Sequence, residues 1–246
     1  MLSDKQKERY SRQIISPKIG EKGQEKISNI KVLQIGAGGL GSPFALYLTA
    51  AGIKELSIID NDVLDISNLQ RQILYNETQI GKDKVNSAKS ILSNLNSDVK
   101  INAYKEYANE DSINRHLKEN DYDFIVDCSD NFSTKFLVNR MAVENEIKCV
   151  IAGIKDFFGQ IITINPKNSA CYQCVFSEPP EQASKEGPLP VIGVTPGILG
   201  TLEALEVIKT TLNHPNLENK VLMVNLLDLR FSVIEIVQDE NCFCTK

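Results

Sequence analysis

The stretch Ile35-Gly36-Ala37-Gly38-Gly39-Leu40-Gly41-Ser42 predicts the fold of this chain. An apolar strand over residues 31–35 leads into it, and a helical pattern over residues 40–51 follows it. Its glycines allow a tight strand-to-helix turn, close approach of a polyphosphate to the backbone, and close packing of the helix on the sheet. The free N–H groups at the helix start would face the phosphates. We therefore expect a nucleotide-binding turn that includes Gly36, Gly38, Gly39 and Gly41.

Strands and helices alternate on both sides of this turn. We expect strands at 31–35, 56–60, 99–104, 123–128 and 148–152, and helices at 40–51, 84–95, 110–119 and 132–145. This alternation is typical of a doubly wound, mainly parallel α/β sheet of the Rossmann-like kind, with the nucleotide at the carboxyl ends of the strands.

After Gly153 the pattern changes. Residues 160–164 favour an added strand, residues 197–212 a buried helix, and residues 220–225 and 230–237 two further strands that extend the sheet in the antiparallel sense. Proline and glutamate are frequent between Ser177 and Pro196, so we expect a mobile loop there.

The composition describes a globular chain of 246 residues, 42% hydrophobic and 24% charged, with a net charge of −5. The acidic balance argues against an extended nucleic-acid surface. No apolar run approaches the roughly 20 residues of a membrane span, and the polar residues 1–12 do not resemble a signal peptide. We expect a cytoplasmic protein with neither nucleic acid nor membrane as a partner.

Polar side chains gather after the predicted strands. Asp60 lies 24 positions after Gly36 and suits the two ribose hydroxyls of a nucleotide. Asp130 follows the strand at 123–128, where a Mg²⁺ ligand would lie. Taken singly, such residues are often helix caps, turn residues or solvated charges. Together they favour a clamp on a triphosphate and its metal, formed with Asp62, Asn68, Arg71, Gln72 and Lys84.

Four of the six cysteines form two close pairs, Cys171 with Cys174 and Cys242 with Cys244. Two pairs of thiolates suit a structural, tetrahedral zinc site, and free thiols are the alternative. The other two cysteines, at 128 and 149, end apolar strands and are expected in the core.

These motifs together resemble the ThiF/MoeB/HesA family, the prokaryotic relatives of the ubiquitin-activating enzymes. The resemblance extends over nearly the whole chain, and the stretches that carry it are 9–13, 36–41, 60–62, 68–72, Lys84, 127–131 and 171–174. It implies that ATP and Mg²⁺ are used to adenylate the C-terminal Gly-Gly carboxylate of a small ubiquitin-fold sulfur-carrier protein. Sulfur then attacks the acyl adenylate and leaves a thiocarboxylate.

The resemblance also implies roles for individual residues. Asp60 would hold the ribose, Asp130 the Mg²⁺, and Asn68, Arg71 and Lys84 the phosphates. Arg12 would enter the site of a neighbouring subunit, so that the active unit is a homodimer.

By the same resemblance the chain is one adenylation domain, 1–246. Its nucleotide-binding part would be 1–153, and its carrier-binding part 154–246 would include the loop at 177–196 and the zinc site. The family normally has Cys-x-x-Cys in the second cysteine pair, whereas this chain has Cys242-x-Cys244.

The expected chemistry needs no general base, because a C-terminal carboxylate with a pKa near 3.5 is already an anion at pH 7. The chain has two histidines, His116 and His214, in no motif, and we expect both at the surface. The barrier is electrostatic, since one anion must approach another, and cations and a metal ion can lower it.

Many relatives carry a loop cysteine that links covalently to the carrier. Here Cys242 is the only cysteine from Val175 to Phe243, and we expect no appended rhodanese-like domain. We therefore expect the reaction to stop at the acyl adenylate and a separate donor to supply the sulfur. Thiamin, molybdopterin and specialised sulfur metabolism all stay open as pathways.

Other classes of function share parts of this pattern. A nicotinamide-dependent oxidoreductase has the same glycine turn, and a non-catalytic scaffold could bind a ubiquitin-fold protein without turnover. A related branch of the family dehydrates a modified tRNA base, which the acidic charge disfavours. The oxidoreductase has no use for Arg12, Arg71, Lys84 and Asp130 together, and the scaffold would lack one of these groups, whereas all are present. We therefore expect the adenylating enzyme.

Overall fold

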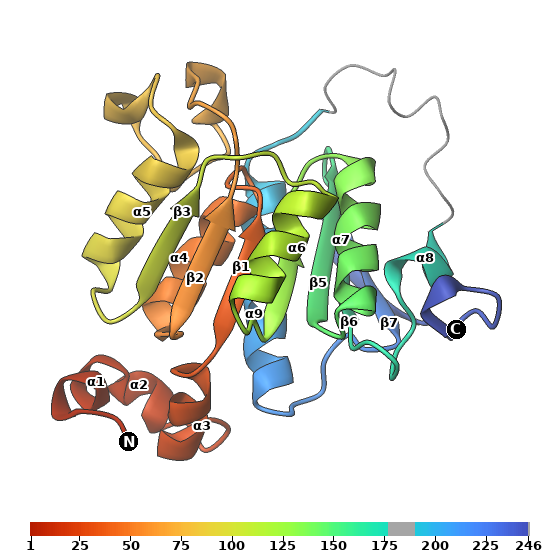
Figure 1. Cartoon of the computed structure of the whole chain (residues 1–246), viewed down its shortest axis with the longest axis horizontal. Coiled ribbons are helices and arrows are strands. Elements are labelled where there is room, and N and C mark those ends of the chain that lie inside the picture. The colour runs from red at the N-terminus through yellow and green to blue at the C-terminus, as the bar shows by residue number, and fades with distance from the viewer. Residues whose placement is uncertain (177–189, 246) are drawn as a thin grey trace.

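The computed structural model describes residues 1–176 and 190–245. Within them, one mixed sheet has the strand order β3-β2-β1-β4-β5-β6-β7-β8 (Figure 1). The strands β1 to β5 pair in parallel, and β6, β7 and β8 add on in the antiparallel sense. The bounds are β1 Lys31–Ile35, β2 Glu55–Ile59, β3 Lys100–Tyr104, β4 Phe124–Asp127, β5 Lys148–Lys155, β6 Phe158–Ile164, β7 Lys220–Asn225 and β8 Arg230–Glu235.

Helices cover both faces of the parallel strands. Because successive strand residues point to opposite faces, Val32 of β1 packs with the apolar side chains of α4, α5 and α9, whereas Leu33 packs with those of α6 and α7. The helices are α1 Asp4–Arg9, α2 Ser11–Ile14, α3 Gly20–Ile27, α4 Gly41–Ala51, α5 Lys84–Leu95, α6 Glu110–Glu119, α7 Phe132–Glu144, α8 Tyr172–Val175 and α9 Val194–Thr211. This arrangement confirms the predicted fold class.

The region before α9 differs from the prediction. The helix expected from residue 197 begins at Val194, which is possible because Pro196 falls in its first turn, where a missing N–H costs nothing. Val191 also pairs with Asp156 in an isolated bridge. The loop predicted for 177–196 therefore extends too far, because α9 already begins at Val194, while 177–189 lie outside the described residues.

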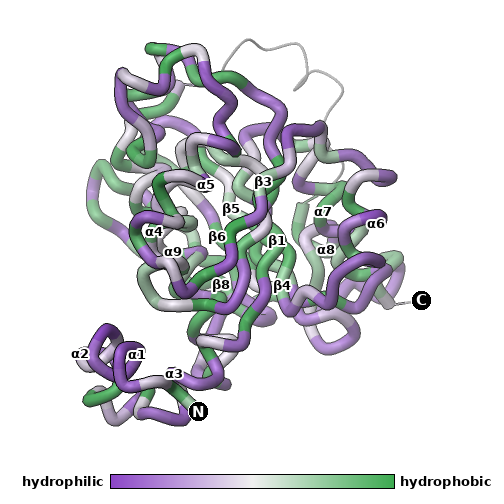
Figure 2. The backbone as a smooth tube through the Cα atoms, turned by 60° about the vertical axis from the view of Figure 1, so that its left-hand side comes forward, coloured by the Kyte–Doolittle hydropathy of each residue, from purple (hydrophilic) through white to green (hydrophobic). Residues whose placement is uncertain are grey.

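The three N-terminal helices pack at the edge of the sheet where the parallel strands begin (Figure 1). Buried Tyr10 contacts Gly52, which ends α4 with φ +84°, and accepts a hydrogen bond of 2.9 Å from Asn96 Nδ2. Gln24 Nε2 donates to Ala51 O at 2.9 Å. Figure 2 shows α1 and α2 as mostly hydrophilic, in contrast to the hydrophobic strands. Because the glycine turn follows the carboxyl end of β1, the three N-terminal helices lie at the opposite end of the strands from it.

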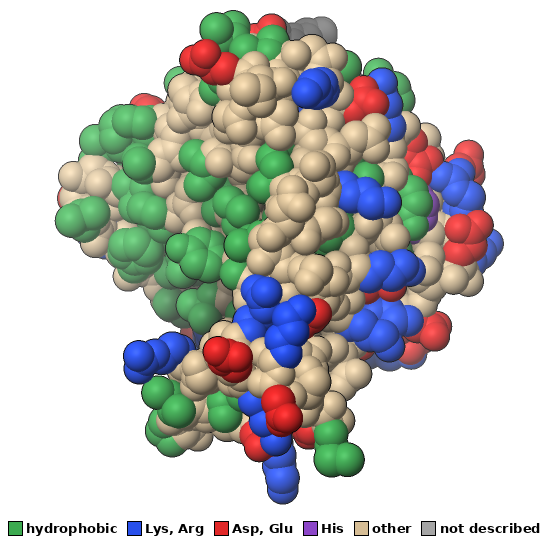
Figure 3. All heavy atoms as spheres, turned by 90° about the vertical axis from the view of Figure 1, so that its left-hand side faces the viewer, with side chains coloured by type: hydrophobic (Ala, Val, Ile, Leu, Met, Phe, Trp, Pro, Cys, Tyr) green, Lys and Arg blue, Asp and Glu red, His purple; other side chains and the backbone are tan. Residues whose placement is uncertain are grey.

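Hydrophobic side chains also reach the surface. They gather on one part of the face in Figure 3. Large exposed examples on α9 and β8 are Val194, Ile198, Leu205, Phe231 and Val233. In the described part of the chain, no helix combines the length and the apolar character that a membrane crossing demands.

Candidate active site

The glycine turn is shaped by close backbone contacts. Gly36 has φ +94°, and a Cβ there would lie 2.8 Å from Cys128 O. A Cβ on Gly41 would lie 2.3 Å from Gly36 O, so only glycine fits at either position. At Gly38 an added Cβ would meet just one group, Gln72 Nε2 at 3.7 Å. The turn is thus packed on the side of Gly36 and Gly41 and open at Gly38, where a ligand can approach the backbone.

Asp60 supports this turn directly. Its carboxylate accepts Ala37 N at 2.7 Å and Asp62 N at 2.8 Å. Tyr75 OH donates to Ala37 O at 2.9 Å, so Ala37 is held on both sides. Burial raises the pKa of Asp60, and the two backbone hydrogen bonds oppose that rise. Each carboxylate oxygen keeps a second lone pair, so Asp60 can hold the turn and still accept a ribose hydroxyl.

Lys84 and Asp62 form a pair beside Asp60. The buried Lys84 ammonium lies 2.8 Å from Asp62 Oδ2, and Lys84 N donates to Asp62 O at 3.1 Å. Lys84 is the first residue of α5, so the segment after β2 and the start of α5 are tied together here. The ammonium has two further donors available for an anionic ligand.

A short 3₁₀ turn, Ile66–Asn68, places the next three candidates. Asn68 Oδ1 accepts Asp65 N at 3.1 Å and caps this turn. Arg71 Nη1 donates to Ser67 O at 3.1 Å, and Arg71 Cγ would lie 3.5 Å from a Cβ on Gly39. The buried Gln72 has its Nε2 near Gly38, and its Oε1 has no hydrogen-bond partner among the described residues. Arg71 and Gln72 therefore border the glycine turn.

Asp130 lies in the segment between β4 and α7, two residues after the contact of Cys128 with the glycine turn. Cys128 N donates to Ile35 O at 2.8 Å, and Cys128 O lies against Gly36. Two residues later, the Asp130 side chain is exposed and forms neither a hydrogen bond nor an ion pair with any residue of 1–176 or 190–245. A carboxylate without a described protein partner is the donor type that Mg²⁺ takes together with substrate phosphates, so Asp130 fits this metal.

Arg12 lies away from the glycine turn. It is exposed on α2, and its neighbour Gln13 donates to Ala51 O at 3.3 Å. Ala51 ends α4, a helix of 11 residues that starts at Gly41 and is about 16 Å long. Arg12 thus lies near one end of α4 and the glycine turn at the other.

Lys135 belongs to no sequence motif but lies directly beneath the Asp130 turn. Its buried ammonium donates to Asp127 Oδ2 at 2.7 Å, Ser129 O at 2.8 Å and Ala152 O at 2.6 Å. From the sequence alone, a lysine at this position is expected to be a solvent-exposed charge. The signal that could have revealed it is Asp127, a carboxylate at the end of an otherwise apolar strand.

His116 corrects a prediction. Its side chain is buried rather than at the surface, because position 116 falls on the inward face of α6 with Ser112 and Ile113. Its ring packs against Tyr104 with centroids 4.0 Å apart and is held by Glu106. The other histidine, at 214, is half-buried, and its Nε2 lies 2.7 Å from Lys18 O.

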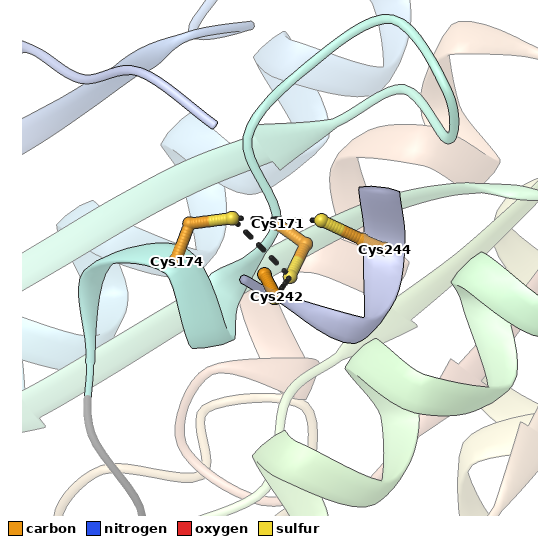
Figure 4. A group of neighbouring side chains, drawn as sticks. All are labelled: Cys171, Cys174, Cys242 and Cys244. Atoms are coloured by element: carbon orange, nitrogen blue, oxygen red, sulfur yellow. Dashed lines mark hydrogen bonds between the residues drawn. The ribbon is translucent and has the colours of Figure 1, made fainter. Parts of the chain in front are cut away.

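The four predicted cysteines form one cluster (Figure 4). The Sγ–Sγ distances are 3.6 Å from Cys171 to Cys242, 3.5 Å from Cys174 to Cys244 and 3.9 Å from Cys171 to Cys174, and all four sulfurs lie within 4.8 Å of one another. A tetrahedral zinc with Zn–S bonds of 2.3 Å requires sulfurs about 3.8 Å apart. The distances therefore fit zinc despite the short Cys-x-Cys spacing.

Burial and hydrogen bonds shift the pKa values of Cys171 and Cys174 in opposite directions. Burial raises the pKa of Cys171 to about 11. Burial acts the same way on Cys174, but hydrogen bonds, including one of 3.4 Å from Asp239 N, bring the pKa of this thiol below its ordinary value. The cluster joins α8 to the C-terminal 3₁₀ turn Phe243–Thr245.

Comparisons with known proteins identify the family of this chain. The ThiF family model matches residues 10–246. The chain is 40% identical over 233 residues to "Adenylyltransferase and sulfurtransferase MOCS3" of Dictyostelium discoideum, which covers 93% of this chain and 54% of that protein. It is 36% identical over 248 residues to "SAMP-activating enzyme E1" of Haloferax volcanii, with 98% of this chain and 89% of that protein covered.

A solved structure shares the fold. The crystal structure of E. coli MccB with ATP has a TM-score of 0.80 and 24% identity, and the match covers 91% of this chain and 68% of that one. The chain spans about half the length of the MOCS3 proteins that it matches. Since the family model matches nearly every residue, the chain belongs to the ThiF family.

Proposed function

We propose that this protein uses ATP and Mg²⁺ to adenylate the C-terminal Gly-Gly carboxylate of a small ubiquitin-fold sulfur-carrier protein, in the cytoplasm. The observation that carries the proposal is the set of polar side chains around the glycine turn. Arg71 and Gln72 border the turn, Asp60 holds it beside the Lys84–Asp62 pair, and Asp130 follows the strand end that packs against Gly36. The names of two relatives, an adenylyltransferase and a SAMP-activating enzyme, support the same reaction class.

In this proposal the ATP phosphates lie over the open side of the turn at Gly38. Backbone N–H groups at the start of α4 bind them, as helix N-termini bind anions. Asn68, Arg71 and Lys84 then contribute polar and cationic side chains, and the unpaired Gln72 Oε1 accepts from the nucleotide or a bound water. Asp60 and Asp62 border the ribose.

Asp130 would hold the metal ion, which on binding neutralises charge that builds on the departing pyrophosphate. The carrier carboxylate is the nucleophile and is ionised at neutral pH, so no residue of the chain must remove its proton. What the chain supplies is orientation and preorganised positive charge. This is why the set contains Arg71 and Lys84 but no histidine.

A second copy of the chain would complete the site. Arg12 lies at the wrong end of α4 to reach the glycine turn of its own chain. An exposed guanidinium there can instead enter the site of a neighbouring subunit. The proposed active unit is therefore a homodimer with reciprocal sites, in which each subunit lends one cation.

The carrier would dock on the 154–246 part of the chain. The start of α9 borders the glycine turn, because a Cβ on Gly39 would lie 3.1 Å from the ring of Pro196. The exposed side chains of Val194 and Ile198 on α9, and of Phe231 and Val233 on β8, provide apolar surface for such a partner. A carrier docked on this surface can extend its Gly-Gly end toward the phosphates, and a separate donor would deliver sulfur.

The cysteine cluster would bind one structural zinc ion. The ion would hold the C-terminal turn against α8, which follows the strand β6. With four thiolates as ligands, no coordination position stays open for substrate. Its contribution is therefore to folding.

The alternative functions use less of this geometry. A nicotinamide-dependent oxidoreductase needs the turn and Asp60 but gives no role to Arg71, Lys84 and Asp130. A non-catalytic scaffold has no need for a free carboxylate at position 130 beside a phosphate-binding turn. The adenylation proposal accounts for each of these side chains.

The test is exchange of labelled pyrophosphate into ATP, measured with a panel of ubiquitin-fold carriers that end in Gly-Gly. We expect exchange with at least one carrier and none without it. Asp130→Ala should reduce exchange about 10²-fold or more, since such groups act on charge that develops in the transition state. Asp121→Ala, which removes an exposed carboxylate at the other end of β4, is the matched control. Exchange at the same rate with and without the carrier, or an undiminished rate in Asp130→Ala, would contradict the proposal.

A further inference from the structure

We infer that Lys135 is a positioning residue of this site. Its ammonium fixes the turn of residues 128–131, and with it the carboxylate of Asp130, against the glycine turn. The role of Asp130 as metal ligand rests on the proposed function. The fixing of the turn does not.

The contacts of Lys135 define a single geometry. An ammonium group has three N–H donors, and here each one meets a different oxygen within 2.8 Å. The acceptors come from the end of β4, from the turn and from β5, and Lys135 itself comes from α7. Four segments therefore meet at one buried atom.

A stabilising role alone would not require this ion pair. Asp127 is fully buried, Lys135 nearly so, and apolar side chains of similar volume often replace such pairs without loss of stability. An apolar side chain cannot, however, bind Ser129 O, the carbonyl one residue before Asp130. What the ammonium adds is a fixed backbone position for the turn.

The rest of the turn is held just as closely. Ser129 Oγ donates to Asp127 Oδ1 at 2.7 Å, and Asn131 Oδ1 accepts Thr134 N at 2.9 Å, which caps α7. Cys128 N is bound to Ile35 O of β1 at 2.8 Å. Of the side chains on this turn, the Asp130 carboxylate is exposed and takes no described partner. The network thus presents one free carboxylate from an otherwise anchored turn.

Three variants isolate this role in the full chain. Lys135→Met keeps the length of the side chain and removes its donors, and the double variant Asp127→Asn with Lys135→Met also removes the unpaired buried charge. Lys135→Arg keeps N–H donors for the same oxygens and should preserve the position of the turn. Glu206→Gln is the matched control, because the buried Glu206 carboxylate pairs with the partly exposed Lys209 and accepts from Thr163 of β6, contacts that Lys135 does not share.

Two measurements report on the turn without turnover. Amide hydrogen exchange of residues 128–131 tests whether the turn is fixed, and it needs no ligand. Binding of Mn²⁺ together with AMPCPP tests whether Asp130 is presented correctly. For the double variant we expect faster exchange in the turn and metal binding weaker by about 10- to 100-fold, the usual effect of losing an outer-shell partner. Lys135→Arg and Glu206→Gln should stay near wild type in both.

Protection of the turn and metal affinity that match wild type in the double variant would overturn the inference, even with a lowered melting temperature. Lys135 would then only stabilise the fold. If wild-type protein bound no Mn²⁺ with AMPCPP, the proposed function would fail instead. Hydrogen exchange in the turn would then decide the role of Lys135 by itself.

Discussion

Substitution by alanine should affect different properties at two glycines of the turn, Gly41 and Gly38. Gly41→Ala places a Cβ 2.3 Å from the backbone oxygen of Gly36, whereas ordinary contact begins at 3.4 Å. Gly38→Ala places its Cβ no closer than 3.7 Å to its single neighbour, and the backbone there is not left-handed. The first variant should therefore lose stability, and the second should lose nucleotide affinity.

The magnitudes follow from these contacts. An overlap of about 1 Å with a backbone atom cannot be relieved by rotating a side chain, so Gly41→Ala belongs at the upper end of overpacking effects, about 3 kcal/mol. For a chain of this length that corresponds to a melting temperature lower by about 6–12 °C. Gly38→Ala should change the free energy of unfolding by less than about 1 kcal/mol. Its methyl group occupies the phosphate approach, so affinity should fall at least tenfold, which is about 1.4 kcal/mol.

Thermal unfolding and calorimetric titration with Mg²⁺ and AMPCPP measure both effects on the same samples. The two variants carry the same chemical change, so each is the control for the other. Wild-type nucleotide affinity in Gly38→Ala would refute the placement of the phosphates. An undiminished melting temperature in Gly41→Ala would refute the packing of the turn.

Three further predictions concern other parts of the molecule. Elemental analysis should find about one zinc per chain. Cys171→Ser should lose the zinc and lower the melting temperature, whereas the control Cys128→Ser should keep the zinc. Wild-type protein that is stable without metal would contradict this. Mixed Arg12→Ala and Asp130→Ala chains should recover about a quarter of wild-type exchange activity, since one site in each mixed dimer is intact, and no recovery after proven subunit exchange would place Arg12 outside the partner's site. Partial burial raises the pKa of Glu106, but hydrogen bonds from a histidine and an arginine outweigh it and hold the pKa below 4.5. The stability that this shift provides is present above pH 4.5 and is lost as the pH falls through the folded pKa, so acid unfolding of Glu106→Gln should depend less on pH.

Much of the fold was predictable because burial on both faces leaves a simple pattern. Strands such as β1 and β4 are covered by helices on either side and read as apolar runs. The two cysteine pairs were predictable as well, although one has an irregular spacing. Two close pairs of thiols are the pattern of a four-cysteine metal site, and the pairs do meet here, with Sγ–Sγ distances below 4 Å.

The features that the sequence concealed depend on contacts between distant residues. The placement of Arg12 follows from the packing of Tyr10 on Gly52, a contact that no local sequence pattern predicts. Lys135 is buried only because three oxygens from separate elements meet at its ammonium. His116 was misjudged because its helix is mostly polar, and burial depends on which face meets the sheet.

The most direct measurement of the central claim is transfer of AMP from ATP labelled at the α-phosphate to a ubiquitin-fold sulfur carrier in a single turnover. The same carrier without its final glycine is the control. Adenylation predicts labelled carrier that forms only with the intact Gly-Gly end and only with Mg²⁺ present. Absence of label on every carrier of the panel, in protein that binds Mg²⁺ and AMPCPP, would show that the nucleotide serves another reaction.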